Sequence, residues 1–194
     1  MKLILASKNK HKAQEIKKIL GDGFEVITQS EAGFSGKVTE DGKTFEENAA
    51  KKAEEVMRAV GAPTVADDSG LCVEALGGAP GVFTARYAGE GATDDENISK
   101  LLNALKDVPD EKRDAEFVCA FALAIPGKET KIFKGSCKGK ILREKCGEDG
   151  FGYDPIFYTP VFENSLASIS ADEKNSISHR GEALKKFKDY ICKK

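Results

Sequence analysis

Hydrophobic residues near the start of the chain fall into short runs separated by a segment of helical spacing. Residues 2–6 form an apolar run that predicts a buried strand, and residues 24–28 predict a second strand. Between them, Ile16 and Leu20 are spaced as on one face of a helix, which Gly21 is expected to end. The chain is therefore predicted to begin with a strand, a helix and a strand.

Two later helices have clear start signals. Thr44 and Glu47 have the spacing of a capping box, and the helix they open is predicted to run to about Val60. Thr93 and Glu96 repeat this spacing before a second set of apolar positions at helical intervals. Each pair predicts a helix whose first turn is hydrogen-bonded by side chains.

The remaining segments are richer in strands. Residues 64–66 predict a strand with acidic residues at its end, and residues 116–125, 130–137 and 139–144 predict antiparallel strands. A final helix is predicted to begin near His179. This order of elements favours an α/β fold in which a mixed sheet is flanked by helices.

Composition narrows the class of protein. Hydrophobic residues make up 40% of the chain and charged residues 32%, which is typical of soluble globular proteins. A net charge of −2 argues against a broad nucleic-acid-binding face, so no nucleic acid partner is expected. The longest apolar runs, such as residues 118–125, are too short to span a bilayer, so no membrane partner is expected. No repeat or linker interrupts residues 1–194, which favours a single domain.

The cysteines and the N-terminus indicate where the protein is found. Five cysteines without a C-x-x-C pair argue against a disulfide framework and against a structural zinc site. The first ten residues, MKLILASKNK, become charged at once, unlike a signal peptide. Both features favour a cytoplasmic protein.

The first polar cluster lies between the first strand and the first helix. A helix N-terminus offers backbone N–H groups and a positive dipole end, which suit a phosphate group, and nearby lysines add charge. The alternative is a solvated turn with ordinary surface lysines. The candidate phosphate-binding residues are Ser7, Lys8, Asn9, Lys10, His11 and Lys12.

A lysine accompanies the apolar face of the helix that follows Thr44. At about 100° per residue, Lys52 projects about 20° to one side of Phe45, at the edge of the apolar stripe and beside Asn48. A lysine there needs an anionic partner or must extend its ammonium group to solvent, and the second interpretation stays open. A bound phosphate would be a suitable partner. The stripe consists of Phe45, Ala49, Val56 and Val60.

Acidic residues form a third cluster. Glu40 and Asp41 precede the helix, and Asp67 and Asp68 follow the predicted strand. Adjacent carboxylates repel one another unless a cation lies between them, and Mg²⁺ typically binds one or two carboxylates together with substrate phosphates. The alternative is a pair of acidic turn residues, with Asp68 forming an Asx turn at Gly70.

The fourth cluster lies towards the C-terminus. Its aromatic residues could stack on a nucleobase, and its charged residues could contact the polar edge of that base. The alternative is an aromatic packing turn beside a helix start with a basic surface. The chain has no P-loop and no G-x-S-x-G elbow, so these clusters together favour a nucleotide phosphohydrolase of another type. The candidate residues are Phe151, Gly152, Tyr153, Asp154, Lys174, His179 and Arg180.

Six motifs resemble those of the inosine/xanthosine triphosphate pyrophosphatase family. In chain order they are ASKNKHK, TFEENAAKKA, VADDSGL, LGGAPGVFTARYAG, GFGYDPIF and EKNSISHRGEAL. They span nearly the whole chain, which makes the resemblance specific. It implies an elongated α/β fold with two lobes and a substrate cleft between them, and a homodimer.

The resemblance also implies roles for the four clusters. Glu40 and Asp68 would hold Mg²⁺, Asp68 would be the general base, and Ser69 would touch the substrate. The segment from Ser7 to Lys12, with Lys52, would bind the phosphates, although Lys10 and His11 occupy positions that vary in the family. The residues implied for the base pocket are Phe151, Gly152, Tyr153, Asp154, Lys174, His179 and Arg180.

The implied reaction is hydrolysis of a nucleoside triphosphate between its α and β phosphates, which gives a monophosphate and pyrophosphate. Lys174 and Arg180 are expected to direct donors at the 6-keto oxygen of a deaminated purine, and adenine lacks that oxygen. One alternative is a related pyrophosphatase acting on pyrimidine or modified nucleotides. Another is a non-catalytic nucleotide sensor, which the presence of Glu40, Lys52 and Asp68 disfavours.

Overall fold

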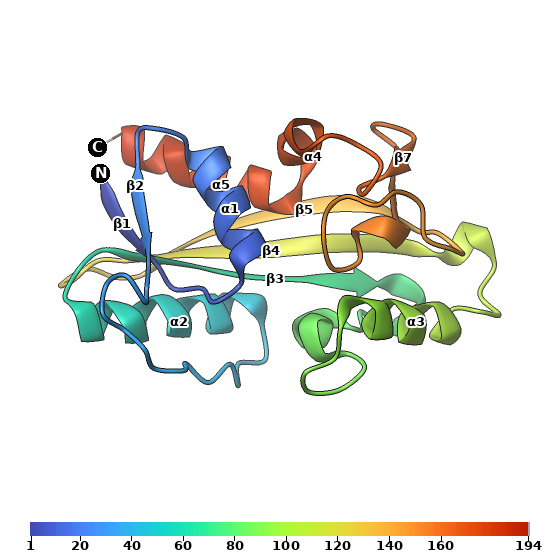
Figure 1. Cartoon of the computed structure of the whole chain (residues 1–194), viewed down its shortest axis with the longest axis horizontal. Helices are drawn as coiled ribbons and strands as arrows, with labels where there is room; N and C mark the ends of the chain where they lie inside the picture. Colours follow the sequence, from blue (N-terminus) through green and yellow to red (C-terminus); the bar gives the residue numbers. More distant parts are fainter. Residues whose placement is uncertain (194) are drawn as a thin grey trace. The chain divides into compact units, whose positions relative to one another are not determined.

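A computed structural model describes residues 1–193 and contains a seven-stranded sheet flanked by helices (Figure 1). The order of its strands is β2-β1-β3-β4-β5-β6-β7. β1 pairs in parallel with β2 and β3, whereas β6 pairs antiparallel with β5 and β7, so the predicted mixed sheet is confirmed. The strands are β1 (Lys2–Leu5), β2 (Glu25–Thr28), β3 (Thr64–Val73), β4 (Asp114–Ala124), β5 (Lys131–Ile141), β6 (Phe157–Thr159) and β7 (Asn164–Ser165).

The predicted helices are also present, and the structure adds one more. The start signals at Thr44 and Thr93 are followed by α2 and α3, and the last helix begins at His179. Helix α4 was not predicted, although Ser170 and Glu173 form a capping box at its start. The helices are α1 (Lys10–Leu20), α2 (Phe45–Val60), α3 (Asp94–Ala104), α4 (Ala171–Ile177) and α5 (His179–Cys192).

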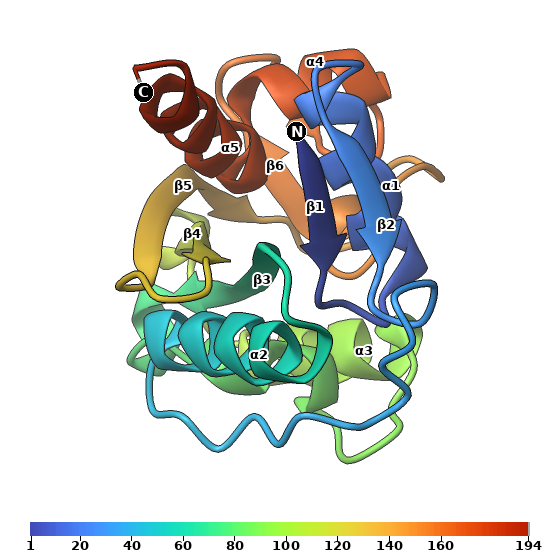
Figure 2. The ribbon, with the colours of Figure 1, turned by 90° about the vertical axis from the view of Figure 1, so that its left-hand side faces the viewer.

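Two compact units, each with its own hydrophobic core, make up the chain. Unit 1 comprises residues 1–68, 119–135 and those from Arg180 onward. In it, α2 covers one face of the strands, and α1 and α5 cover the other (Figures 1 and 2). Its core includes Leu3, Leu5, Ile16, Phe121, Leu184 and Phe187.

Unit 2 comprises residues 69–118 and 136–179. Here α3 lies on one face of the strands and α4 on the other (Figure 1). Strands β3, β4 and β5 contribute residues to both units. The core of unit 2 includes Leu71, Val73, Ile98, Leu101, Phe117, Tyr153 and Phe157.

The capping predictions are confirmed in part. Thr93 and Glu96 form the complete box, with both reciprocal hydrogen bonds. Thr44 accepts a bond from the Glu47 amide, but the Glu47 carboxylate accepts from the Lys43 amide rather than from Thr44. The Glu47 carboxylate thus bonds to the amide one residue before the N-cap, so the predicted return bond to Thr44 is wrong.

The predicted end of the third strand is wrong. β3 continues to Val73, so Asp67 and Asp68 lie inside a strand of ten residues rather than in an acidic turn. Leu71 and Val73 are buried in the core of unit 2, and this burial extends the strand beyond the polar residues. The Asx-turn alternative for Asp68 is accordingly wrong as well.

The strands predicted at residues 130–137 and 139–144 form one continuous strand, β5. A Cβ atom on Gly139 would lie 2.2 Å from the Tyr158 carbonyl oxygen and 2.6 Å from the Phe157 ring. Gly139 therefore marks a close approach of β6 to β5 rather than a break between two strands.

Two expectations drawn from composition can be compared with the described residues. Within residues 1–193, no helix is both long and apolar enough to cross a membrane. Within the same residues, none of the five cysteines forms a disulfide bond.

The close approach at Gly139 predicts the effect of adding a single methyl group. Gly139→Ala should lower the free energy of unfolding by about 1 to 3 kcal/mol, because overpacking displaces β6 or its Phe157 ring. Urea unfolding followed by circular dichroism measures this. Gly23→Ala is the matched control, because a Cβ atom there meets nothing within 4 Å. Equal stability of the two variants would contradict this account of the strand.

Candidate functional site

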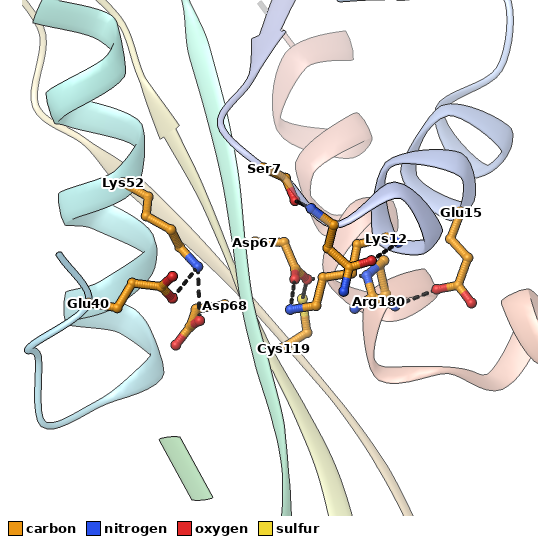
Figure 3. Close-up of polar contacts among 10 residues, drawn as sticks. Ser7, Lys12, Glu15, Glu40, Lys52, Asp67, Asp68, Cys119 and Arg180 are labelled. Carbon is orange, nitrogen blue, oxygen red and sulfur yellow. Dashed lines mark hydrogen bonds and ion pairs between the residues drawn. The ribbon is translucent and has the colours of Figure 1, made fainter. Parts of the chain in front are cut away.

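The two adjacent aspartates of β3 point to opposite faces of the strand. Successive side chains of a strand alternate between its faces, so Asp67 and Asp68 cannot share one environment. Figure 3 shows Asp68 directed towards Lys52 and Glu40, and Asp67 directed towards Lys12 and Arg180. The acidic pair that the sequence suggested is therefore divided into two separate clusters.

The Asp68 cluster consists of Glu40, Lys52 and Asp68. The Lys52 ammonium lies 2.8 Å from Glu40 Oε2 and 2.9 Å from Asp68 Oδ1. The side chain of Lys52 is only 12% exposed, so this lysine pairs with two carboxylates instead of extending into solvent. The alternative interpretation of Lys52 as a surface lysine is wrong.

Burial and charge shift the pKa values of this cluster in different directions. Burial raises the pKa of Asp68, and the charge of Glu40 acts in the same direction, although Lys52 and Lys12 oppose both. Burial also acts to raise the pKa of Glu40, but Lys52 outweighs it and holds that pKa below its ordinary value. For Lys52, burial acts to lower the pKa, and the two carboxylates raise it further than burial lowers it. Lys52 therefore stays charged.

The segment that carries Glu40 is fastened to the start of α2. The buried side chain of Asn48 accepts a hydrogen bond of 2.8 Å from the Gly42 amide. A Cβ atom on Gly42 would lie 2.6 Å from Asn48 Oδ1, so this close approach requires glycine. Asp41, which the sequence grouped with the acidic cluster, instead pairs with Lys51 on the surface.

The carboxylates of the Asp68 cluster suit a magnesium ion that arrives with phosphate. Among the described residues, no group of three or more His, Cys, Asp and Glu side chains is arranged to hold a metal ion. Mg²⁺ rarely uses such a cage, since it binds one or two protein carboxylates and completes its coordination with water and substrate phosphates. Glu40 and Asp68 provide such a pair of hard oxygen donors.

The Asp67 cluster is more deeply buried. The Asp67 side chain is fully buried and lies 2.6 Å from the Lys12 ammonium and 3.2 Å from Arg180 Nε. It also accepts a hydrogen bond of 3.1 Å from the thiol of Cys119. Arg180 forms a second ion pair with Glu15. One carboxylate of β3 thus joins α1, β4 and α5 within unit 1.

This arrangement changes the interpretation of Arg180. The side chain is 1% exposed and its guanidinium is bonded to Asp67 and Glu15. Burial acts to lower the pKa of Arg180, but the two carboxylates outweigh it and raise the pKa, so the charge is permanent. Arg180 was expected to direct its donors at a purine, whereas the structure places these donors on the buried carboxylate of Asp67 and the half-buried carboxylate of Glu15.

The predicted phosphate segment forms the loop before α1 and the first turn of that helix. Asn9 is the N-cap of α1, and its side-chain oxygen accepts a hydrogen bond of 3.0 Å from the Lys12 backbone amide. The backbone amide of Asn9 donates to Ser7 Oγ at 3.1 Å. The side chains of Lys8, Lys10 and His11 are exposed. Of the lysines in this segment, Lys12 is the one that reaches the Asp67 cluster.

In unit 2, the residues predicted to hold the base lie close together. Lys174 donates to Asp154 Oδ2 at 2.6 Å, and both side chains are at most 5% exposed. The Phe151 amide donates to the same oxygen at 2.9 Å, and the Lys174 ammonium lies 4.7 Å from the centre of the Phe151 ring. The Gly152 amide donates to Asp94 at 2.7 Å.

Two predicted base-pocket residues are buried more deeply than expected. Tyr153 is 2% exposed and belongs to the hydrophobic core of unit 2, so its ring has no free face on which a base could stack. His179, a candidate for the base pocket, is 5% exposed, and its ring stacks on that of Phe117 with 4.9 Å between the ring centroids. Ser69 is half-buried in β3.

Several residues of these clusters were not identified from the sequence. Glu15 follows Lys12 by three positions on α1, a spacing that places both on one helix face and that could have indicated a shared partner. Cys119 lies within an apolar run and carries no such signal. Thr84 and Asp94, which contact residues 151–154, belong to segments whose side chains had no assigned role.

Comparisons with known proteins show which family this chain resembles over nearly its whole length. The model of the Ham1 family matches residues 3–190. A dITP/XTP pyrophosphatase of Bacillus subtilis (strain 168) is 50% identical over 185 residues, which cover 95% of this chain and 93% of the relative. The Staphylococcus aureus Ham1 protein is 43% identical, with a TM-score of 0.89 and 98% of both chains covered. A HAM1 protein from Coxiella burnetii is 42% identical, with a TM-score of 0.91 over the whole of both chains.

The resemblance inferred from the six motifs is thus confirmed over nearly the full length of the sequence, and this chain belongs to the Ham1 family.

Proposed function

We propose that this protein hydrolyses deaminated purine nucleoside triphosphates, such as dITP, ITP and XTP, to the monophosphate and pyrophosphate with the help of Mg²⁺. The observation that supports this most strongly is the Asp68 cluster, in which two carboxylates and a buried lysine converge. The names of curated relatives, which are dITP/XTP pyrophosphatases at up to 50% identity, support the substrate class.

In the proposed mechanism, Asp68 accepts the proton of a water molecule that attacks the α-phosphorus. The bond from that phosphorus to the bridging oxygen breaks, and pyrophosphate leaves. Because burial raises the pKa of Asp68, this carboxylate is a stronger proton acceptor than an ordinary aspartate. When bound at Glu40 and Asp68, Mg²⁺ would supply Lewis-acid polarisation of the phosphate oxygens.

In the same mechanism, the lysines stabilise the negative charge of the departing pyrophosphate. Lys52 keeps its proton beside Asp68 and offers a fixed positive charge to the phosphates. Lys12 and the exposed residues Lys8 and Lys10 add positive charge near the N-terminus of α1, which favours anions. The same proposal includes a homodimer, as the resemblance implies, and a cytoplasmic location, which suits five free thiols.

The Lys174–Asp154 pair is proposed to recognise the base. Hypoxanthine and xanthine present the O6 acceptor beside the N1–H donor, and a lysine beside a carboxylate presents the complementary donor and acceptor. Adenine reverses both groups. Buried mismatches of this kind cost about 1 to 3 kcal/mol for each group left unpaired. Guanine has the same O6 and N1–H groups, so this pair does not distinguish it.

Replacing Asp68 with asparagine tests the proposed reaction. Asp68→Asn keeps the shape of the side chain but removes the proton acceptor, so turnover of dITP should fall about 100-fold or more. Pyrophosphate release with magnesium present measures this across a panel of purine and pyrimidine triphosphates. Asp110→Asn, which removes a surface carboxylate paired with Arg143, is the matched control. Turnover in Asp68→Asn that equals the control would exclude this mechanism.

The second prediction concerns selectivity. The parent protein should prefer dITP to dATP by about a thousandfold in kcat/KM, because two mismatches multiply. Lys174→Met removes the donor and should reduce this preference mainly by lowering kcat/KM for dITP. Lys145→Met, which removes an exposed lysine paired with Asp95, is the control. A parent with no preference, or a variant that loses activity on both nucleotides equally, would contradict this account of base recognition.

A further inference from the structure

Thr84 lies between strand β3 and the turn formed by residues 151–154. Its Oγ1 accepts a hydrogen bond of 2.8 Å from the Leu71 amide of β3 and donates one of 2.7 Å to the Gly81 carbonyl. Its own carbonyl accepts a bond of 3.0 Å from the Tyr153 hydroxyl. A single residue therefore connects the strand that carries Ser69 with the turn that carries Asp154, and all of these residues belong to unit 2.

The hydrogen bond from the Tyr153 hydroxyl to the Thr84 carbonyl is costly to break. The Tyr153 side chain is packed in the core, where its hydroxyl needs a partner. Burial raises the pKa of Tyr153, so the hydroxyl keeps its proton and acts as the donor to Thr84. A shift of the Thr84 carbonyl would leave the buried Tyr153 hydroxyl without its bond, which favours displacement of the turn together with Thr84.

Towards β3, the connection is made by the hydrogen bond between the Leu71 amide and the Thr84 hydroxyl. Leu71 follows Ser69 by two residues, so the two side chains lie on the same face of β3. The Leu71 amide donates to the side-chain hydroxyl of Thr84. Thr84 thus contacts β3 through a side chain, and a substitution can remove this contact while the backbone hydrogen bond from Val73 to Ala79 remains.

We propose that Thr84 is a positioning residue that holds the 151–154 turn in register with Ser69 on β3. This inference rests on the proposed function in one respect, namely that a nucleotide contacts both elements during the reaction. Thr84 touches no substrate itself. It sets the separation between Ser69 and the Lys174–Asp154 pair, and a displacement of about 1 Å between groups that hold one substrate can cost about 100-fold in rate.

Hydrogen exchange tests the positioning without relying on activity. In Thr84→Val, which removes the hydroxyl and keeps the shape, the amides of residues 151–154 should exchange faster than in the parent. Tyr153→Phe should have the same effect, and the double variant should add little to it, because both changes break one connection. Thr84→Ser keeps the hydroxyl and should restore the parent exchange rates.

Thr159→Val is the matched control. Thr159 is a fully buried threonine of β6 in the same unit, and its hydroxyl accepts a bond of 3.3 Å from the Val161 amide. It undergoes the same change of side chain, but it makes no hydrogen bond to the 151–154 turn. Unchanged exchange of residues 151–154 in Thr84→Val, or equal acceleration in Thr159→Val, would overturn the proposal.

Kinetics then tests the consequence for the reaction. In Thr84→Val, kcat/KM for dITP should fall about 10- to 100-fold and the preference for dITP over dATP should shrink, while Thr84→Ser and Thr159→Val behave like the parent. Loss of stability alone, with the parent's kcat/KM and preference per folded molecule, would overturn the positioning role. A parent that releases no pyrophosphate from any nucleotide would contradict the proposed function instead, and the exchange experiment would still decide the role of Thr84.

Discussion

The alternation of side chains along β3 is the constraint on which the rest of the site depends. Two identical residues, Asp67 and Asp68, are adjacent in the sequence, yet the pleat of the strand directs them to opposite faces. Asp67 is fully buried among cations that belong to α1 and α5. Asp68 keeps part of its surface exposed and shares one lysine with Glu40. The same chemical group is therefore enclosed by cations on one face of β3 and lies partly exposed beside Lys52 and Glu40 on the other.

This division predicts that the two carboxylates contribute differently to the free energy of unfolding. Asp67 is held by two cations and a thiol, so its charge is compensated in the folded chain. The pKa of Asp68 is raised by burial, which means that the folded chain binds its proton more tightly than the unfolded chain does. Ionised Asp68 therefore opposes folding at neutral pH.

Local patterns predicted most of the secondary structure. Thr44 and Thr93 cap helices, as the sequence indicated, because each cap hydrogen bond joins residues three positions apart. The errors arose where distant residues decide the outcome. β3 extends past Asp68 because Leu71 and Val73 enter the core of unit 2, and β5 continues through Gly139 because β6 packs against it.

The candidate site was predictable to a similar extent. Lys52 was identified from its position beside an apolar stripe, and its partners Glu40 and Asp68 were both among the candidates. Arg180 was misjudged because its partners, Asp67 and Glu15, are separated from it by more than a hundred residues. No spacing in the sequence indicates such an ion pair. The roles of Thr84 and Asp94 were hidden for the same reason, since each reaches a turn far along the chain.

The most direct test of the division between the two aspartates is to compare the stabilities of Asp67→Asn and Asp68→Asn in the absence of metal. Urea unfolding with a chelator present measures the free energy of unfolding of each variant and of the parent. Asp67→Asn should lose about 3 to 5 kcal/mol, because it leaves buried Arg180 and Lys12 without a charged partner on β3. Asp68→Asn should be as stable as the parent or more stable, because it removes an ionised group that opposes folding. Equal losses in the two variants, or a larger loss in Asp68→Asn, would contradict the account.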